Sequence, residues 1–403
     1  MTGHVAFFSF PAYAHLAPTL PVVEELVRRG RRVTYAAADR FADQVRAAGA
    51  ELLRYDSTFP WQEGIPENVA GQAIAFIDEA LSPLPAALDR FADDVPDLLV
   101  HDSAATEAAR ILARHWGRPC VQSSAVFVSN EAFSLNDAQD AGRGENQLPM
   151  GDMAALEKFA QQQDEMLASL GLSDVDITGF GGDAGPNVVY LPREFQVRGE
   201  TFGPQFCFVG PMLADQGDDD SWRPPATGAP LVLISLGTSP SPGRVEFFTN
   251  CAKAFADTPW HVVMTLGGSL HPDELGPLPP NVEARQWVKH PAVLRHADVF
   301  VTHSGMGSVM EALSIGVPLV CVPHHAEQNV NAARAAELGL GVVVDRETAD
   351  GTELVDQVSR VAGDPAFRRA AQAMRDAIAA AGGVRRAADF VESLMGNSGR
   401  SEQ

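Results

Sequence analysis

A glycine-containing segment in the second half of the chain has the residue types and spacing of a phosphate-binding loop. The strand-like run 299–302 is followed by His303, Gly305, Gly307 and Ser308, and then by a helical pattern. A strand that ends in such a loop and opens into a helix points unpaired amides and the positive end of the helix dipole at one spot. The glycines allow a phosphate to approach the backbone, and His303 and Ser308 can donate to its oxygens. The segment therefore predicts a phosphate site.

A second explanation of the same residues needs no ligand. Ser308 and Glu311 have the Ser-x-x-Glu spacing of a capping box, in which the two side chains satisfy the first amides of a helix. Glycine-rich turns between a strand and a helix are also common. From these residues alone, both explanations stay open.

A second candidate for chemistry is His15, which comes shortly after the apolar run 5–10. By position alone, such a histidine is more often a surface or capping residue than a catalyst. Asp102 follows another strand-like run, 98–101, and the carboxyl ends of parallel strands share one rim of a sheet. An imidazole oriented by a carboxylate is the usual general base at neutral pH. We therefore take His15 and Asp102 as a candidate dyad, with His101 and Asp97 as competing neighbours of Asp102.

Two stretches contain residue types that bind metals, but their context argues against a metal site. The Asp run 218–220 lies in a linker-like stretch and is best explained as a solvated charge run. His324, His325 and Glu327 are close in sequence, but adjacent side chains on an extended loop diverge. The sequence predicts no metal site.

The elements that must position these residues repeat one pattern twice. Short β-branched or apolar runs alternate with Ala-rich helical stretches, which indicates parallel sheets with crossover helices. The expected strands are 5–10, 32–37, 98–101 and 120–123 in the first half and 230–235, 261–265, 282–285, 299–302, 318–322 and 341–344 in the second, with first-half helices at 20–29 and 103–115.

A stretch rich in Asp, Gly and Pro at 214–228 lacks a hydrophobic period and predicts a linker between residues 1–213 and residues 229–380. Open α/β sheets bind ligands beyond the carboxyl ends of their strands. A cleft between the two halves is therefore the expected place for the chemistry.

Two stretches of the first half, 56–96 and 127–186, do not follow the alternation of strands and helices. Long insertions of this kind usually form binding loops or lids. Most of their aromatic side chains are expected simply to pack, while a subset could line a pocket for a bulky apolar ligand. The candidates for such a subset are Phe59, Trp61, Phe76, Phe127 and Phe133.

Composition limits the partners. The 403 residues are 45% hydrophobic and 20% charged, as in a globular protein long enough for about two domains. The net charge of −22 repels polyanions and excludes nucleic acid as an expected partner, but short-range amide contacts can still bind a small anion.

The apolar runs are too short to span a bilayer, and the first residues lack a basic signal region. We expect no membrane partner, a cytoplasmic location, and reduced, buried cysteines at 120, 207, 251 and 321.

An ordered set of residues in the second half resembles the nucleotide-sugar signature of the family 1 glycosyltransferases. The set combines a tryptophan, the pattern His-x-Gly-x-x-Ser-x-x-Glu, a Gly-x-Pro and a Glu-Gln pair. These residues are Trp287, His303, Gly305, Ser308, Glu311, Gly316, Pro318, Glu327 and Gln328. Weaker similarity covers nearly the whole chain, and it is greatest to the bacterial macrolide-type enzymes that act on natural products.

The resemblance implies the α/β fold known as GT-B. Two doubly wound, Rossmann-like domains would face each other across a cleft, with 1–213 binding the acceptor and 229–380 binding the nucleotide sugar. A C-terminal helix at 381–396 would cross back to the N-terminal domain, followed by a disordered tail at 397–403.

The resemblance also implies roles for individual residues. His15 would be the catalytic base, with Asp102 as its carboxylate, and the five aromatic candidates would bind the acceptor. Trp287 would stack on the nucleobase, and Glu311 would bind the ribose. The loop around His303 would bind the diphosphate, and Glu327 and Gln328 would bind the sugar. The implied donor site comprises Ser235, Thr238, Trp287, Val288, His303, Ser304, Gly305, Gly307, Ser308, Glu311, Glu327 and Gln328.

The implied activity is that of an inverting hexosyltransferase. It would move a hexose, with glucose from UDP-glucose as the first candidate, to a hydroxyl of a hydrophobic natural product such as a macrolide, ansamycin or polyphenol. The implied partners are a UDP-sugar or TDP-sugar and a small hydrophobic acceptor, without cofactor or metal, and we expect a monomer or weak homodimer. The alternatives are a TDP-deoxysugar-dependent biosynthetic enzyme, a sugar-nucleotide epimerase and a non-catalytic nucleotide-sugar-binding partner.

The chain departs from the family pattern in both of its halves, on the expected donor side and on the expected acceptor side. Where the family usually has Trp-x-Pro-Gln, this chain has Trp287, Val288, Lys289 and His290. The contact that the family's Gln makes near the nucleoside must therefore be made differently or lost. At the other end, the usual Gly-His and following Asn are replaced by Ala14-His15 and Ala17.

Overall fold

The computed structural model describes residues 3–61, 64–142, 148–174, 185–213, 222–226, 228–237, 243–268, 270–345 and 351–395. Within them, the first half forms a parallel seven-stranded sheet in the order β3-β2-β1-β4-β5-β6-β7. Its strands are β1 (His4–Phe8), β2 (Arg32–Ala37), β3 (Glu51–Arg54), β4 (Leu98–Asp102), β5 (Cys120–Ser124), β6 (Asn187–Val189) and β7 (Phe206–Phe208).

The second half forms a parallel six-stranded sheet in the order β10-β9-β8-β11-β12-β13. Its strands are β8 (Leu231–Ser235), β9 (His261–Thr265), β10 (Val282–Arg285), β11 (Val299–Thr302), β12 (Leu319–Cys321) and β13 (Gly341–Val343). In each sheet the strand order reverses at the first strand, which is the doubly wound arrangement. The expected fold class is confirmed, and β2, β9, β10 and β11 coincide with the predicted ranges.

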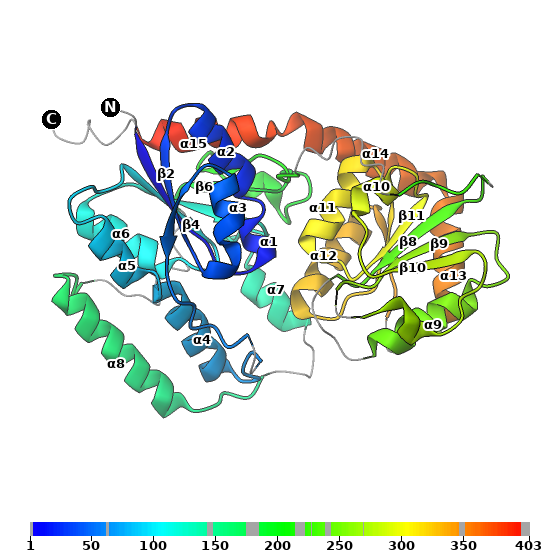
Figure 1. Cartoon of the computed structure of the whole chain (residues 1–403), viewed down its shortest axis with the longest axis horizontal. Coiled ribbons are helices and arrows are strands. Elements are labelled where there is room, and N and C mark those ends of the chain that lie inside the picture. Colours follow the sequence, from blue (N-terminus) through cyan, green and yellow to red (C-terminus); the bar gives the residue numbers. More distant parts are fainter. Residues whose placement is uncertain are drawn as a thin grey trace.

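Helices connect the strands and cover the sheets (Figure 1). Because helices cover both faces of a parallel sheet, its central strands are buried along their length, as β1, β4 and β8 are here. The α-helices are α1 (Tyr13–Leu16), α2 (Leu20–Arg28), α3 (Ala42–Ala47), α4 (Val69–Leu81), α5 (Leu84–Arg90), α6 (Glu107–Trp116), α7 (Leu135–Gly142), α8 (Met153–Ser169), α9 (Arg244–Ala254), α10 (His290–Leu294), α11 (Met306–Ile315), α12 (Ala326–Glu337), α13 (Gly351–Gly363), α14 (Pro365–Ala380) and α15 (Gly383–Met395).

The two insertions differ from the expected irregular loops. The first contains α4 and α5, and the second contains α7 and α8. Asn68 and Asp152 cap the starts of α4 and α8 by accepting from the amides of Gly71 and Ala155. The expectation of irregular loops was therefore wrong for these segments, whose capping residues had marked helix starts. The short strands β3, β6 and β7 were also missed, because three or four residues carry too little periodicity to be recognised.

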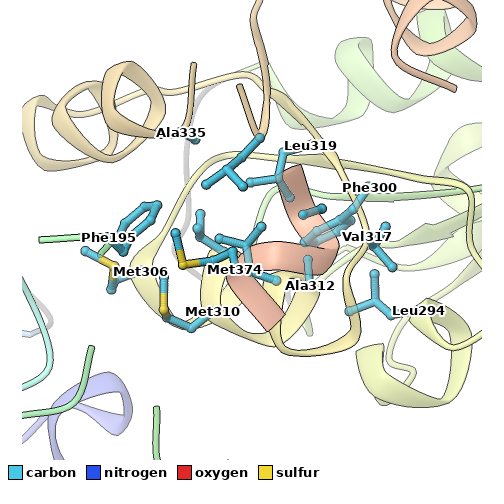
Figure 2. Packing of buried hydrophobic residues seen from close by; sticks show 14 of the residues in the cluster. Phe195, Leu294, Phe300, Met306, Met310, Ala312, Val317, Leu319, Ala335 and Met374 are labelled. Carbon is cyan, nitrogen blue, oxygen red and sulfur yellow. The ribbon is translucent and has the colours of Figure 1, made fainter. Parts of the chain in front are cut away.

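Apolar packing joins the two sheet units. One buried cluster contains Phe127 and Phe195 from the first half together with Phe300, Met306 and Met310 from the second. Figure 2 shows Phe195 beside Met306 on the side of α11 that faces the first half. In addition, α7 packs against α12. The two units are therefore held together by buried side chains.

The C-terminal helices run from the second unit back to the first (Figure 1). Gly382 and Gly383 separate α14 from α15 with φ values of 97° and 56°, a conformation that glycine adopts at little cost. The Gly383 amide donates to the Val209 carbonyl at 2.9 Å, which ties the bend to the end of the first half. Ala387, Ala388 and Val391 of α15 are then buried in the core of the first unit.

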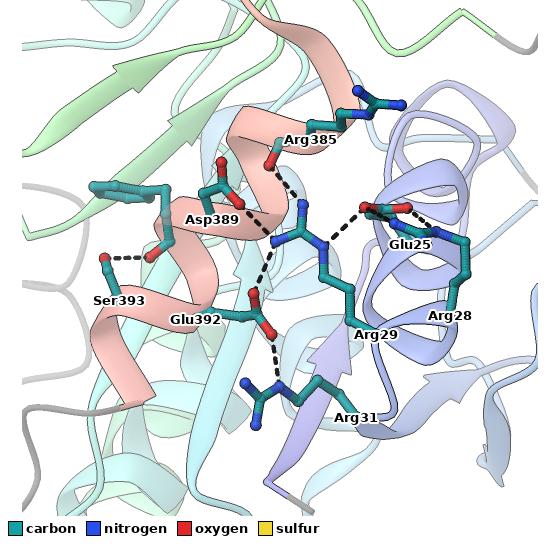
Figure 3. Close-up of polar contacts among 9 residues, drawn as sticks. Glu25, Arg28, Arg29, Arg31, Arg385, Asp389, Glu392 and Ser393 are labelled. Atoms are coloured by element: carbon teal, nitrogen blue, oxygen red, sulfur yellow. Dashed lines mark hydrogen bonds and ion pairs between the residues drawn. The ribbon is translucent and has the colours of Figure 1, made fainter.

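A charged network holds α15 against α2 (Figure 3). The Arg29 guanidinium donates to Glu25 at 2.8 Å, to Asp389 at 2.6 Å and to Glu392 at 2.8 Å. It also donates to the Arg385 carbonyl at 3.2 Å. Because the Arg29 side chain is only 20% exposed, water screens these contacts less than it screens a lone surface pair.

Several expectations concern residues near or outside the described parts. Of the predicted linker, Trp222 is described, and it is buried with its indole N–H donating to Glu283 of β10. The Asp run 218–220, Thr238 and the tail 397–403 lie outside the described residues. Cys207, Cys251 and Cys321 are buried free thiols, as expected, whereas Cys120 is half-buried. Among the described helices, none combines the length and apolar character that crossing a bilayer requires.

The Arg29 network gives a stability prediction. Arg29→Met should lower the free energy of unfolding by about 1–2 kcal/mol, because it removes the guanidinium that binds Asp389 and leaves Glu392 with Arg31 as its partner. Arg28→Met is the matched control, since Arg28 is exposed and pairs with Glu25 alone among the residues that the structure describes, and it should change that free energy by less than about 0.5 kcal/mol. Urea unfolding measures both variants. An equal decrease in the free energy of unfolding in the two variants would contradict the role of Arg29 in holding α15 against α2.

Candidate active site

The candidate dyad residues meet at the carboxyl edge of the first sheet. His15 lies in the single turn α1 after β1, and Asp102 is the last residue of β4. Phe8 of β1 pairs with His101 of β4, so Asp102 extends just beyond the end of β1. The His15 Nδ1 lies 2.9 Å from Oδ1 of Asp102. That oxygen also accepts from the Ala104 amide at 2.7 Å, which fixes the carboxylate.

Electrostatics around His15 favour a proton on the ring. Burial opposes the charged imidazolium, but the charge and hydrogen bond of Asp102, with a smaller contribution from Glu327, raise the His15 pKa above its usual value of 6.5. Asp102 is 2% exposed and His15 is 22% exposed. With Nδ1–H donating to the carboxylate, the neutral ring has its Nε2 lone pair available to accept a proton.

The aromatic candidates form two groups. Phe59 and Phe76 lie 5.0 and 5.4 Å from the ring of Phe10, and Trp61 lies 6.0 Å from it. Phe10 itself lies 5.4 Å from the His15 ring. The first group is therefore an aromatic wall next to the candidate dyad.

The second aromatic group lies in the packing between the two sheet units. Phe127 is 3% exposed and stacks on Phe195 at 5.5 Å, with the half-buried Phe133 at 6.2 Å from Phe127. Phe127 and Phe133 belong to or pack against the cluster that joins the units. The ring contacts do not bring these two together with Phe59, Trp61 and Phe76.

The predicted phosphate loop has a strained turn at Ser304. Ser304 is fully buried and has a φ of 67°, a left-handed conformation that costs a residue with a Cβ about 1–2 kcal/mol. Its amide donates to Thr302 Oγ1 at 3.1 Å, and its carbonyl accepts from the Asn331 side chain at 2.9 Å. Non-glycine residues in such conformations cluster at functional sites.

The loop opens into α11 without a side-chain cap. The N-cap is Gly305, and among the described residues no side chain caps the first turn, so its amides can meet a ligand. The capping-box explanation is therefore wrong: Ser308 lies inside the helix, and Glu311 contacts His290 instead. A Cβ on Gly305 would lie 2.5 Å from His303 Nε2, whereas one on Gly307 would meet no described atom. Packing against His303 thus requires glycine at 305, while glycine at 307 keeps the helix start open.

His303 is a neutral side chain in this loop. Burial, together with smaller contributions from nearby His290 and Arg244, lowers its pKa to about 4. Its Nδ1 is buried and has no hydrogen-bond partner among the described residues. A Cβ on Gly237 would lie 2.6 Å from the ring, so this glycine lets the two loops approach. His303 can contribute a hydrogen bond to a bound phosphate rather than a full charge.

Arg244 supplies a positive charge behind the phosphate loop. It is 6% exposed and donates to the carbonyls of Leu236, Gly237 and Leu266 at 3.2, 2.9 and 2.7 Å. These bonds fix the segment after Ser235, whose hydroxyl accepts from the Gly237 amide at 3.2 Å. Ser235 ends β8 and His303 directly follows the neighbouring β11, and the His303 amide donates to the Ser235 carbonyl at 3.3 Å.

The residues predicted for the nucleoside lie after β10 and on α11. Trp287 is 63% exposed and Val288 is buried, so the indole is accessible for stacking. Glu311 Oε2 lies 3.1 Å from His290 Nδ1. His290, where the family usually has Gln, is thus the partner of the carboxylate predicted to bind the ribose.

The residues predicted for the sugar lie in the first turn of α12. The charge of Glu327 acts on His15, so α12 begins near the candidate dyad. Gln328 Oε1 accepts from the His324 amide at 2.8 Å, which leaves the side-chain N–H groups of Gln328 as donors. Both half-buried side chains can therefore meet a ligand between the two units.

Three residues near the site were not recognised from the sequence: Phe10, Arg244 and Asn331. Phe10 was expected inside a strand that in fact ends at Phe8, and Arg244 and Asn331 lie outside the motif positions. The departure from the family pattern at position 290 had marked His290. Among the described residues, no group of three His, Cys, Asp or Glu side chains could hold a metal ion.

The dyad geometry predicts the titration of His15. Asp102→Asn should lower the His15 pKa from above to below about 6.5, because the charge that raises it is removed while burial remains. Asp97→Asn is the matched control, since that carboxylate accepts from the His4 amide, and it should leave the His15 pKa unchanged. An NMR titration of the His15 ring measures both. An unchanged His15 pKa in Asp102→Asn would contradict the predicted coupling.

Comparisons with known proteins give the same family throughout. Residues 253–392 match the model of the erythromycin biosynthesis protein CIII-like C-terminal domain. The chain is 36% identical to the NDP-glycosyltransferase YjiC of Bacillus subtilis, with 98% of each chain covered. It is 34% identical to the oleandomycin glycosyltransferase of Streptomyces antibioticus, with 98% of this chain and 91% of the relative covered.

Solved structures of glycosyltransferases are also similar to this chain over nearly its full length. The calicheamicin glycosyltransferase CalG4 superposes with a TM-score of 0.87 at 39% identity, and the match covers 98% of this chain and 99% of that one. The glycosyltransferase of kitacinnamycin gives a TM-score of 0.86 at 33% identity, covering 98% of this chain and 100% of that one. With this identity over nearly the full length and the two doubly wound sheets described above, the chain belongs to the family 1 glycosyltransferases of the natural-product type, with the GT-B fold.

Proposed function

We propose that this protein is an inverting, UDP-sugar-dependent hexosyltransferase that glycosylates a hydroxyl of a hydrophobic natural product. The observation that carries the proposal is the His15–Asp102 contact of 2.9 Å at the edge of the first sheet, within electrostatic reach of Glu327 from the second half. The acceptor hydroxyl would bind next to His15, against the aromatic wall formed with Phe10. A macrolide, ansamycin or polyphenol has the apolar surface that this wall would cover.

The reaction is a single displacement. Nε2 of His15 removes the proton of the acceptor hydroxyl, and Asp102 stabilises the imidazolium that forms. The hydroxyl oxygen forms a bond to the anomeric carbon while the bond from that carbon to the diphosphate oxygen breaks. Attack from the face opposite the leaving group inverts the anomeric carbon.

The leaving diphosphate would be held without a metal. Its developing charge would meet the uncapped amides of α11 and the hydrogen bond of His303. Arg244 adds a buried positive charge nearby, as its effect on the His303 pKa indicates. These groups are in place before the reaction, so they stabilise the leaving group with little rearrangement.

UDP-glucose is the donor that we favour. Exposed Trp287 would stack on the uracil, and Glu311 would accept from the ribose hydroxyls, with His290 holding its other side. Glu327 and Gln328 would bind the hydroxyls of the sugar. A deoxysugar would leave some of these polar groups unpaired at about 1–3 kcal/mol each, which argues against the TDP-deoxysugar alternative.

We infer a cytoplasmic protein, because Cys207, Cys251 and Cys321 are reduced, buried thiols, as is usual in a reducing compartment. Whether the protein is a monomer or a weak homodimer stays a prediction. Gel filtration over a range of protein concentrations distinguishes the two.

The proposed reaction is tested by product formation. With UDP-glucose, a panel of macrolide, ansamycin and flavonoid alcohols, and EDTA present, mass spectrometry should find hexose-sized additions. His15→Ala should lower kcat by about 100-fold or more, with UDP binding nearly unchanged, because only proton transfer is lost. His115→Ala, which changes an exposed histidine of α6, should retain wild-type activity.

Other outcomes would identify other functions. Isomerised UDP-sugar without added alcohol would support the epimerase, and UDP-glucose binding without any product would support the non-catalytic binding protein. Loss of activity in EDTA that is restored by magnesium or manganese would contradict the metal-free leaving-group site. A His15→Ala rate within a few-fold of wild type would remove His15 from the mechanism.

The donor preference gives a separate prediction. Glu327→Ala should reduce the preference for UDP-glucose over a TDP-deoxysugar by about 10-fold, because a sugar-hydroxyl partner is lost, while UDP alone binds as before. Glu337→Ala, at the exposed end of the same helix, is the control. Specificity constants for both donors measure the effect. A wild-type preference for the deoxysugar would contradict the UDP-glucose assignment and leave the dyad untouched.

A further inference from the structure

Helix α12 carries three functional contacts on one face. Glu327, Asn331 and Arg334 are spaced by four and three residues, which places them above one another along a helix. Glu327 interacts with His15, Asn331 contacts the phosphate loop, and Arg334 contacts the first half. The catalytic proposal uses only the first of these.

Asn331 supports the strained residue of the phosphate loop. Its Nδ2 donates to the Ser304 carbonyl at 2.9 Å, and both residues are fully buried. Ser304 has the φ of 67° that turns the chain from β11 into the uncapped start of α11. A serine in this conformation needs its neighbours to hold it, whereas a glycine does not.

Arg334 ties the same helix to the acceptor-side half. Its guanidinium donates to the carbonyls of Glu194, Phe195 and Gln196 at 3.0, 3.0 and 3.1 Å. The buried Gln196 side chain in turn bonds to both the amide and the carbonyl of Val128, at 3.1 and 3.0 Å. Arg334 thus holds a segment that is itself fixed to the first unit.

We propose that Asn331 and Arg334 are positioning residues that make α12 a rigid connection between the phosphate loop and the acceptor-side half. Asn331 keeps Ser304 in its left-handed conformation and so shapes the amides at the start of α11. Arg334 sets the position of α12, and with it Glu327, relative to His15. The inference rests on the proposed function, because UDP is the ligand used to probe the loop.

The Asn331 contact is tested by a double-mutant cycle with Ser304→Gly. Asn331→Ala should weaken UDP binding about 10-fold by calorimetry, because Ser304 relaxes and the amides of α11 lose their arrangement. In the Ser304→Gly background, Asn331→Ala should weaken UDP binding by about 2-fold or less, since a glycine adopts the left-handed conformation without support from Asn331. Asn331→Leu fills the buried volume without the N–H donor. It should also weaken UDP binding with Ser304 present and have little effect in the Ser304→Gly background. The control Asn250→Ala, at an exposed position of α9, should leave UDP binding unchanged.

A readout without ligand separates this inference from the proposed function. Hydrogen exchange of the Val309 amide, which donates to the Gly305 carbonyl at 3.0 Å at the start of α11, should speed up about 10-fold in Asn331→Ala, and the increase should largely disappear in the Ser304→Gly background. Wild-type protein that does not bind UDP would contradict the proposed function, while the exchange measurement would still decide the role of Asn331. Equal effects of Asn331→Ala in both backgrounds would overturn that role.

The Arg334 contact should affect turnover rather than nucleotide binding. Arg334→Met keeps the aliphatic stem and should lower kcat about 10-fold, with UDP affinity within about 2-fold of wild type, because donor and base are misaligned. Arg334→Lys can still reach the carbonyls and should recover part of the rate. Glu337→Gln removes only the exposed carboxylate that pairs with Arg334, so it should behave as wild type. An unchanged kcat in Arg334→Met, or a matching loss of UDP affinity, would overturn the connection.

Discussion

The packing between the two sheet units is the constraint on which the site depends. No pairing between the described strands joins the two sheets, so their relative position rests on buried side chains such as Phe195 and Met306 and on the return of α15 to the first unit. His15 and Asp102 come from one sheet, and Ser304 and Glu327 follow strands of the other. Without this packing, each unit would hold only half of a site.

The two histidines at the candidate site differ in the direction of their pKa shift because their neighbours differ. His15 and His303 are both partly buried, which disfavours the charged imidazolium. The carboxylate of Asp102 reverses the effect at His15 and raises its pKa, whereas nearby positive groups reinforce it at His303. One histidine is therefore suited to accept a proton, and the other to donate a hydrogen bond while staying neutral. Neighbouring charges, more than burial, assign the two roles.

Several features followed from the sequence for physical reasons. The central strands are buried on both faces, so apolar runs such as 231–235 and 299–302 indicated them directly. Because side chains that follow parallel strands lie at the carboxyl edge of their sheet, Asp102 was expected at the edge of the first sheet and His303 at the edge of the second. The helices of the two insertions were overlooked because strand alternation was the pattern sought, although Asn68 and Asp152 had the residue types of helix caps.

The sequence by itself determined the fold class, the family and the chemical types at the site, because these depend on local periodicity and on short motifs. Tertiary structure decided what depends on contacts distant in the chain. It separated Phe127 from the aromatic wall near His15, paired Glu311 with His290, and connected Asn331 to a strained Ser304. No sequence pattern encodes a φ of 67° at a serine, since that angle exists only where surrounding contacts hold it.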